Sequence, residues 1–251
     1  MNNLNDNIPL LEVRNLSKHF GPIKALNDLS MVVRRGEVVA VVGDNGAGKT
    51  TLIKALSGVY RPTAGELLLN GKPAIFSNPQ QAREEGIETI YQDLALADNL
   101  SIGANIFLGR EPMRRAFGFL PVLDRRKMAE AACSTMALLD FHVSRTETPV
   151  SNFSGGQRQA VAIGRAVYWD AQILIMDEPT AALGVPEQRK VLSLIHKLKA
   201  QGRGVIFVSH NLQDIFAVSD RIVVLRRGVL AGERQISETN HDEVVKLMVG
   251  G

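Results

Sequence analysis

Cysteine and long apolar runs are nearly absent from this sequence. Cys133 is the single cysteine among 251 residues, so the chain holds no internal disulfide and no thiolate metal cluster. We therefore expect a reduced, intracellular setting, with Cys133 a small buried residue on a helix. No apolar run reaches the roughly 18 residues that span a bilayer, and residues 1–7 are polar and lack a signal core. The chain is expected to be soluble by itself and to reach a membrane only through a partner.

The net charge of the chain is also small. The chain has 29 basic and 26 acidic side chains, a net charge of +3. Doubled arginines at positions 34–35, 114–115, 125–126 and 226–227 are spread along the sequence, whereas a nucleic-acid binder tends to gather its basic residues on one element. Nucleic acid is therefore not an expected partner. The composition, 45% hydrophobic and 22% charged, is that of a globular domain with a sizeable core.

Short β-rich runs alternate with helical patterns in the first and last thirds of the chain. The continuous apolar run at 38–42 is typical of a strand buried on both faces of a parallel sheet. Asn70 and Gly71 signal a tight turn. Strands are expected at 10–13, 29–33, 38–42, 66–69, 87–91, 173–176, 204–209 and 222–225, and helices at 49–57, 158–166 and 186–200. This alternation predicts an α/β fold with a mostly parallel sheet and a small antiparallel β region.

The middle of the chain, from about residue 94 to 166, has a mostly helical pattern. Asp124 is expected to cap one of its helices, and Gly118 with Pro121 to mark a loop before that helix. The expected buried face of the helix consists of Met128, Ala132, Met136 and Leu139. The economical interpretation is one domain over residues 1–251, in which a helical subdomain is inserted into the core.

A complete phosphate-loop motif, G-x-x-x-x-G-K-[ST], follows the apolar run at 38–42 and precedes a helical pattern. Its glycines let backbone N–H groups turn toward phosphates, and the helix N-terminus adds partial positive charge. Lys49 is expected to reach the β- and γ-phosphates, Thr50 to coordinate Mg²⁺, and Thr51 to lie near the α-phosphate. The loop comprises Gly43, Asp44, Asn45, Gly46, Ala47, Gly48, Lys49, Thr50 and Thr51. The motif alone does not separate a kinase from a GTPase or an ATPase.

Two adjacent carboxylates end the apolar strand at 173–176. Such a pair is costly at the exit of a buried strand without a cation, so Asp177 is expected to hold Mg²⁺, directly or through water. Glu178 is expected to act as general base on the attacking water. The alternative is a solvated turn, since Pro179 follows at once. His210 follows the strand at 204–209, where parallel sheets bind ligands, and is a candidate to hold the γ-phosphate and orient the water.

A second glycine-containing segment precedes the helical pattern at 158–166. It consists of Ser154, Gly155, Gly156 and Gln157. Consecutive glycines at a helix N-terminus suggest a second anion site, about a hundred residues after the first. A plain helix-start turn is the alternative, and the string itself does not exclude it.

These motifs, in this order and at these distances, make nearly the whole chain resemble the ATP-binding-cassette transporter ATPases. The resemblance implies that two subunits sandwich two nucleotides, and that Ser154 and Gly156 act on the ATP held by the other subunit. It implies that Gln92 contacts Mg²⁺ or the attacking water, and that Phe20 stacks on adenine. Lys49, Gln92, Glu178 and His210 would then be the catalytic group, with Thr50, Gln92 and Asp177 at the metal. Two departures are Phe153, where leucine is usual, and Gly184, where many relatives carry an aspartate that contacts the partner subunit.

The stretches 104–112 and 178–183 are similar to bacterial monosaccharide-importer ATPases of the ribose, xylose and fructose group. This implies an ATPase at the cytoplasmic face of the inner membrane, working with a permease and indirectly with a periplasmic or extracellular binding protein. Those relatives commonly fuse two cassettes, so a single cassette implies a homodimer, closed by ATP and reopened by hydrolysis. The alternatives are import of an amino acid or another solute, a soluble cassette ATPase of DNA repair or translation, and a P-loop kinase.

Overall fold

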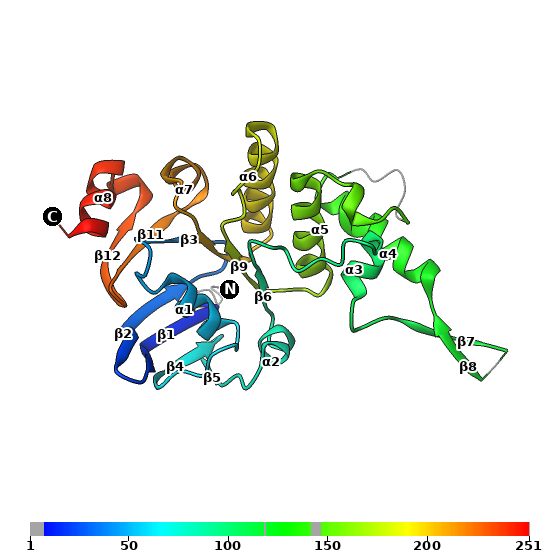
Figure 1. Ribbon diagram of the computed structural model, residues 1–251, viewed down its shortest axis with the longest axis horizontal. Coiled ribbons are helices and arrows are strands. Elements are labelled where there is room, and N and C mark those ends of the chain that lie inside the picture. Colours follow the sequence, from blue (N-terminus) through cyan, green and yellow to red (C-terminus); the bar gives the residue numbers. More distant parts are fainter. Residues whose placement is uncertain (1–7, 118, 142–146, 251) are drawn as a thin grey trace, which may run out of the picture.

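The computed structural model describes residues 8–117, 119–141 and 147–250. Two sheets lie side by side at one end of the molecule, and a helical region extends from them toward the other end (Figure 1). The polar residues 1–7 and the expected loop residue Gly118 lie outside the described ranges.

A six-stranded sheet forms the centre of the fold. Its strand order is β12-β11-β3-β10-β9-β6, and every neighbouring pair is parallel except β11 and β12. In spatial order the strands are β12 (Val229–Gln235), β11 (Arg221–Arg226), β3 (Val38–Val42), β10 (Gly204–Val208), β9 (Ile173–Asp177) and β6 (Ile87–Ile90). The mostly parallel sheet is thus confirmed, and its parallel strands present their carboxyl ends at one edge.

The smaller sheet is antiparallel, as the sequence predicts, and its strand order is β2-β1-β4-β5. Its strands are β1 (Leu11–Phe20), β2 (Ile23–Val33), β4 (Ala64–Leu69) and β5 (Lys72–Ala74). The tight turn between β4 and β5 is made by Asn70 and Gly71, both with positive φ, 48° and 76°.

Eight α-helices lie within the described ranges. They are α1 (Lys49–Leu56), α2 (Pro79–Glu84), α3 (Ile102–Phe107), α4 (Arg125–Leu138), α5 (Gly155–Tyr168), α6 (Val185–Ala200), α7 (Leu212–Val218) and α8 (His241–Val249), with short 3-10 turns η2 (Val150–Asn152) and η3 (Ile236–Glu238). None of the helices in this part of the chain is both long enough and apolar enough to cross a membrane.

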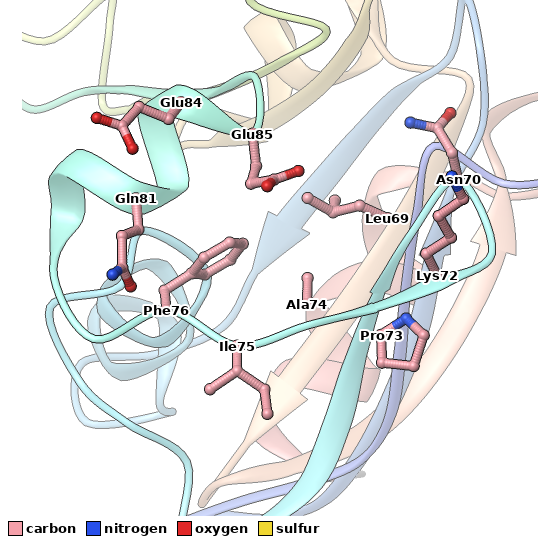
Figure 2. Close-up of a pocket in the computed structure, with 10 residues that line it drawn as sticks. All are labelled: Leu69, Asn70, Lys72, Pro73, Ala74, Ile75, Phe76, Gln81, Glu84 and Glu85. Carbon is pink, nitrogen blue, oxygen red and sulfur yellow. The ribbon is translucent and has the colours of Figure 1, made fainter.

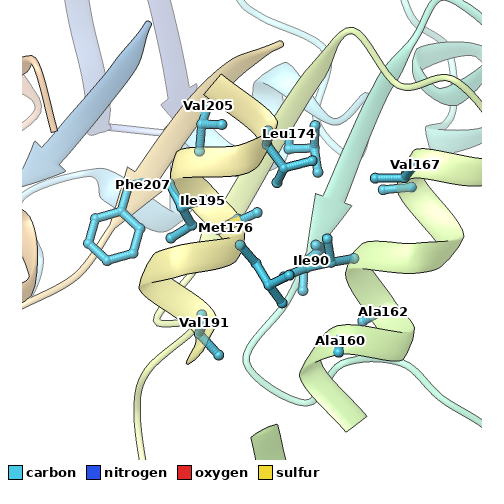
Figure 3. Packing of buried hydrophobic residues seen from close by; sticks show 14 of the residues in the cluster. Ile90, Ala160, Ala162, Val167, Leu174, Met176, Val191, Ile195, Val205 and Phe207 are labelled. Carbon is cyan, nitrogen blue, oxygen red and sulfur yellow. The ribbon is translucent and has the colours of Figure 1, made fainter. Parts of the chain in front are cut away.

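The central sheet is buried on both faces. Alternate residues of β3 enter two different hydrophobic clusters, because side chains alternate across a strand. Val38, Ala40 and Val42 pack in the cluster of the long helices, and Val39 and Val41 in the cluster of α1 and the antiparallel sheet. Figure 3 shows the first cluster, where Met176 and Phe207 of the sheet face Ile195 of α6. The continuous apolar run predicted this two-sided burial.

The middle of the chain is less uniformly helical than its pattern indicates. Asp124 caps α4 as predicted, accepting a hydrogen bond from the Lys127 N–H at 3.1 Å, and the four predicted face residues of α4 are buried. A β-hairpin, β7 (Met113–Ala116) and β8 (Leu120–Leu123), precedes α4, so the expected loop around Pro121 is wrong. Cys133 lies on α4 as expected, but it is exposed and not buried.

Arg221 at the start of β11 ties the two sheets together. Its side chain is only 1% exposed, and its guanidinium donates to the Glu37 carboxylate at 2.8 Å and to the Val32 carbonyl at 2.7 Å. A Glu233 oxygen lies 2.8 Å from another guanidinium nitrogen. Val32 belongs to β2 of the antiparallel sheet and Glu233 to β12, so one buried cation holds three strands in register.

Arg221→Met is expected to lower the free energy of unfolding by about 3 kcal/mol, because it leaves the half-buried Glu37 carboxylate without its buried partner. Urea denaturation measures the change. Arg34→Met is the matched control: Arg34 pairs with the same carboxylate, but its side chain is 60% exposed and the contact is 3.8 Å, so the expected cost is below about 1 kcal/mol. Equal losses in the two variants would contradict the role given to burial.

Candidate functional site

A cavity of about 1030 Å³ opens at the edge where β3, β6, β9 and β10 end. The predicted phosphate loop, Gln92, Asp177, Glu178 and His210 all line it. Residues as far apart in the sequence as Gly43 and His210 therefore meet at one site, because parallel strands place their carboxyl ends together.

The phosphate loop runs from β3 into α1. Gly43 has a φ of 152°, and a Cβ added there would lie 2.3 Å from the Leu225 carbonyl oxygen. Gly48 has a φ of 110°, and a Cβ added there would lie 2.9 Å from the Ala25 carbonyl oxygen. Only glycine fits both positions. Gly48 is also the N-cap of α1 and offers no side-chain cap, so the first N–H groups of the helix remain available to an anion.

Lys49 folds back over the loop that precedes it. Its ammonium donates to the carbonyl oxygens of Gly43 at 2.6 Å and Asp44 at 3.1 Å. These bonds hold the cation at the mouth of the loop, where phosphate oxygens of higher negative charge would replace neutral carbonyls as its partners.

Asp177 and Glu178 lie at the end of β9, facing Lys49 across the cavity. Burial raises the pKa of Asp177, the neighbouring Glu178 carboxylate raises it further, and Lys49 lowers it. A divalent cation bound here would offset both causes, because it stabilises the charged form of the carboxyl group. Glu178 has a positive φ of 51° and its N–H donates to the Val208 carbonyl at 2.8 Å, which turns its side chain out of the strand direction.

His210 and Gln92 complete the polar wall of the cavity. The His210 Nδ1 atom lies 2.9 Å from a carboxylate oxygen of Glu178, and the imidazole is mostly exposed. Gln92 lies two residues after the end of β6 and is exposed in the same cavity. The oxygen-rich set of Thr50, Gln92 and Asp177 suits Mg²⁺, which is commonly held by one or two carboxylates together with substrate phosphates and water. In the described ranges no group of three or more His, Cys, Asp or Glu side chains forms a metal cage.

Phe20, which was predicted to stack on adenine, does not line this cavity. It ends β1, is 41% exposed, and its ring meets Tyr60 edge-on at 5.2 Å between centroids. Phe20 is therefore a surface side chain and not part of the core. Residues of the same hairpin, Ile23 and Lys24, do line the cavity, so Phe20 stands next to it.

The segment from Ser154 to Gln157 lies apart from the phosphate loop of the same chain. It lines a different cavity of about 600 Å³, together with Glu187 and Lys190 of α6. Ser154 and Gln157 form a reciprocal capping box at the start of α5: the Gln157 N–H donates to the Ser154 hydroxyl at 3.4 Å and the Ser154 N–H donates to the Gln157 side-chain oxygen at 2.8 Å. The helix-start interpretation is right, and the exposed Ser154 also leaves room for an additional ligand.

The glycines of this segment are required by close packing. A Cβ at Gly155 would lie 2.7 Å from the Leu183 side chain, and one at Gly156 would lie 2.9 Å from that of Glu187. Leu183 follows the Asp177–Glu178 pair by a few residues. The second glycine segment is therefore in direct contact with the chain that leaves the first cavity.

Five residues that line this cavity were not predicted: Ile23, Lys24, Ala25, Arg227 and Met248. Arg227 and Gly228 form the turn between β11 and β12, both with positive φ. The Gly228 N–H donates to the Ala47 carbonyl at 2.9 Å, so this turn braces the phosphate loop. The arginine–glycine pair signals a turn in the sequence, but no sequence pattern places that turn against residue 47.

Another cavity, of about 620 Å³, lies between the β4–β5 hairpin and α2 (Figure 2). Phe76 and Ile75 form its floor beside the hairpin, and Glu84 and Glu85 of α2 stand above them. None of the predicted site residues lines it.

A phosphate loop after the central strand β3, with an acidic pair at the end of β9 on the other side of β10, defines the class of P-loop nucleoside triphosphatases. Residues 26–181 match the model of the ABC transporter family. The chain therefore belongs to the ABC transporter family, as one of its ATP-hydrolysing cassettes.

Relatives that carry assigned functions cover most of the chain. It is 48% identical to the xylose/arabinose import ATP-binding protein XylG of Sulfolobus acidocaldarius, over 95% of this chain and 93% of that protein. It is 44% identical to the fructose import ATP-binding protein FrcA of Rhizobium meliloti, over 88% of this chain and 86% of that one. The ribose import ATP-binding protein RbsA 2 of Streptomyces avermitilis is 42% identical over 96% of this chain, which spans only 47% of it.

Two solved structures show the same fold. The ADP conformation of MJ1267, an ATP-binding cassette of an ABC transporter, matches with a TM-score of 0.83 and 23% identity over 98% of this chain and 100% of that chain. A dimeric post-hydrolysis state of the cassette MJ0796, bound to ADP and Pi, matches with a TM-score of 0.74 and 24% identity over 90% of this chain and 98% of that one.

Proposed function

We propose that this chain is the ATP-hydrolysing subunit of an importer for a monosaccharide, acting with a separate permease in the cell membrane. The observation that carries the proposal is the convergence of the phosphate loop, the acidic pair and His210 on one cavity. The names of the relatives supply the cargo class: xylose or arabinose, fructose and ribose. A peripheral position at the cytoplasmic face, and indirect coupling to a periplasmic or extracellular binding protein, follow from that role.

In the proposed reaction water attacks the γ-phosphorus of ATP while the bond to the ADP oxygen breaks. Glu178 accepts the proton of the water, and His210, 2.9 Å from Glu178, keeps that carboxylate oriented and reaches the γ-phosphate. Lys49 and the loop N–H groups stabilise the charge that develops on the phosphate oxygens. Mg²⁺, held by Thr50, Asp177 and Gln92, would supply further positive charge at the β- and γ-phosphates.

We further propose that two copies of the chain act together. Ser154 and the phosphate loop line two different cavities of one chain. A second copy is therefore needed to bring the two segments onto one nucleotide. A dimer with two-fold symmetry contains two such sites, because the phosphate loop of each copy meets the Ser154 segment of the other. The dimeric cassette bound to ADP and Pi is a precedent for such an assembly.

Reconstitution with the co-purifying permease in proteoliposomes tests the transport role. ATPase activity is measured against a panel of binding proteins, each loaded with its own solute. We expect stimulation by a pentose- or hexose-loaded binding protein and none by the same protein without sugar. Stimulation only by an amino-acid-loaded protein would replace the sugar with that cargo, and phosphoryl transfer from ATP to an added acceptor would indicate a kinase.

A further inference from the structure

The hairpin of β7 and β8 is the least covered part of the described chain. Figure 1 shows it at the far end of the molecule's longest axis, beyond α3 and α4, with no other element alongside. Its two strands pair only with each other. Because a lone two-stranded hairpin is marginally stable in water, a surface that covers it is expected.

Aromatic side chains gather at the tip of this hairpin. Phe117 is 90% exposed and Phe119 is 79% exposed, and Leu120 next to them is also exposed. Buried aromatic residues stabilise cores and interfaces, so two phenylalanines left almost fully in water mark an unoccupied contact surface.

Arginines stand directly behind this apolar tip. The side chains of Arg114 and Arg115 are exposed and form no ion pair or hydrogen bond among the described residues. As neighbours on a strand they point to opposite faces of the hairpin, so each face carries one cation. Phe117 stands in the turn just after β7, and Ala116 alone separates it from Arg115.

Charge of one sign is concentrated around this hairpin. Residues 110–127 contain six basic and two acidic side chains, a net charge of +4, so the other 233 residues together carry −1. The hydrogen bond from the Asp124 N–H to the Pro112 carbonyl at 2.8 Å closes the hairpin base and brings Arg125 and Arg126 beside it. Two of the four doubled arginines, eleven positions apart in the sequence, therefore lie near one surface, where Arg126 is paired with Glu130 at 2.8 Å.

We propose that the hairpin tip, Phe117, Phe119 and Leu120 with Arg114 and Arg115, inserts into the headgroup layer of an anionic phospholipid bilayer. Interfacial segments bury apolar side chains about 5–10 Å deep while basic side chains remain at the phosphates, and here the arginines of β7 lie just behind the phenylalanines of the turn. The cytoplasmic loops of a permease carry excess lysine and arginine and would repel the same hairpin. The lipid surface is thus the favoured partner, and the inference goes beyond the proposed transport role.

Flotation of the full-length protein with phosphatidylcholine vesicles, with and without phosphatidylglycerol, tests the proposal. No permease is present, so the outcome is independent of the transport role. We expect binding only to the anionic vesicles, weakened at high salt because ions screen the arginines. Arg114→Gln/Arg115→Gln is expected to reduce binding about 30-fold, taking roughly a factor of five for each cation near such a surface.

Phe117→Ser/Phe119→Ser is expected to reduce binding at least about tenfold and to leave ATPase activity and circular dichroism unchanged. Arg34→Gln/Arg35→Gln removes the same charge from another exposed doubled arginine and is expected to bind like the parent protein. Absence of binding at low salt, equal binding of all variants, or self-association lost in the phenylalanine variant would overturn the proposal. So would binding of a mixed-sequence oligonucleotide that competes with the vesicles.

Discussion

Glu178→Gln is expected to lower the ATP turnover number by a factor of roughly 100 to 10,000, the usual contribution of a general base. Glutamine has the shape of glutamate and keeps an oxygen near the His210 ring, so the 2.9 Å contact need not be lost. It cannot accept the proton of the attacking water at neutral pH. The backbone position of Glu178, fixed by its N–H bond to the Val208 carbonyl, is unchanged by the substitution.

Nucleotide affinity should stay within about threefold of the parent value, because the phosphate loop and Lys49 are untouched. ATP should then accumulate unhydrolysed and hold the protein as a dimer, which size-exclusion chromatography with and without ATP detects. The matched control is Glu84→Gln on the exposed side of α2, outside the nucleotide cavity. Turnover by Glu178→Gln at the rate of that control would show that another group takes the proton.

Much of this site was predictable because its requirements are local. The loop from Gly43 to Thr51 needs only a buried strand before it and a helix after it, and both are evident in the apolar pattern. The convergence of Gln92, Asp177 and His210 follows from one further fact, that each lies at or within two residues of the carboxyl end of a parallel strand. Neither inference depends on how distant side chains pack.

The β7–β8 hairpin was missed for the opposite reason. Its strands carry adjacent arginines and a proline, and they show no clean alternation of apolar and polar residues. The neighbouring helical pattern therefore dominated the prediction. Cys133 was placed on the correct helix, but the buried face of α4 is set by contact with α3 and α5, and its side chain falls outside that face. The turn of Arg227 against the phosphate loop likewise depends on long-range packing.

The arrangement of two copies of the chain in a dimer cannot be derived from contacts within one chain. Ser154 is exposed on its own cavity, and the phosphate loop is open on another. If these surfaces meet only between subunits, defects placed in the two motifs belong to different composite sites. That arrangement allows a direct test with mixed subunits.

Lys49→Ala and Ser154→Arg are each expected to abolish ATPase activity as homodimers. Lys49 is the cation at the mouth of the loop, and an arginine at the exposed position 154 would block an approaching nucleotide. Mixing the two proteins in equal amounts should restore roughly a quarter of the parent activity, since about half of the dimers are mixed and each holds one intact site. The rate of phosphate release, before and after subunit exchange, measures this.

Ser151→Arg, at an exposed serine just before the segment, is the matched control and should remain active. Activity would also stay absent if the dimer must hydrolyse ATP at both sites together. To separate this case from the absence of composite sites, each variant is also made with Glu178→Gln and given its own affinity tag. ATP-induced dimerisation of the mixture is then measured by pull-down on each tag. Composite sites predict that ATP joins the two variants into mixed dimers more readily than it joins either variant to itself. No preference for mixed dimers, together with no regained activity, would mean that Ser154 does not act on the partner's nucleotide.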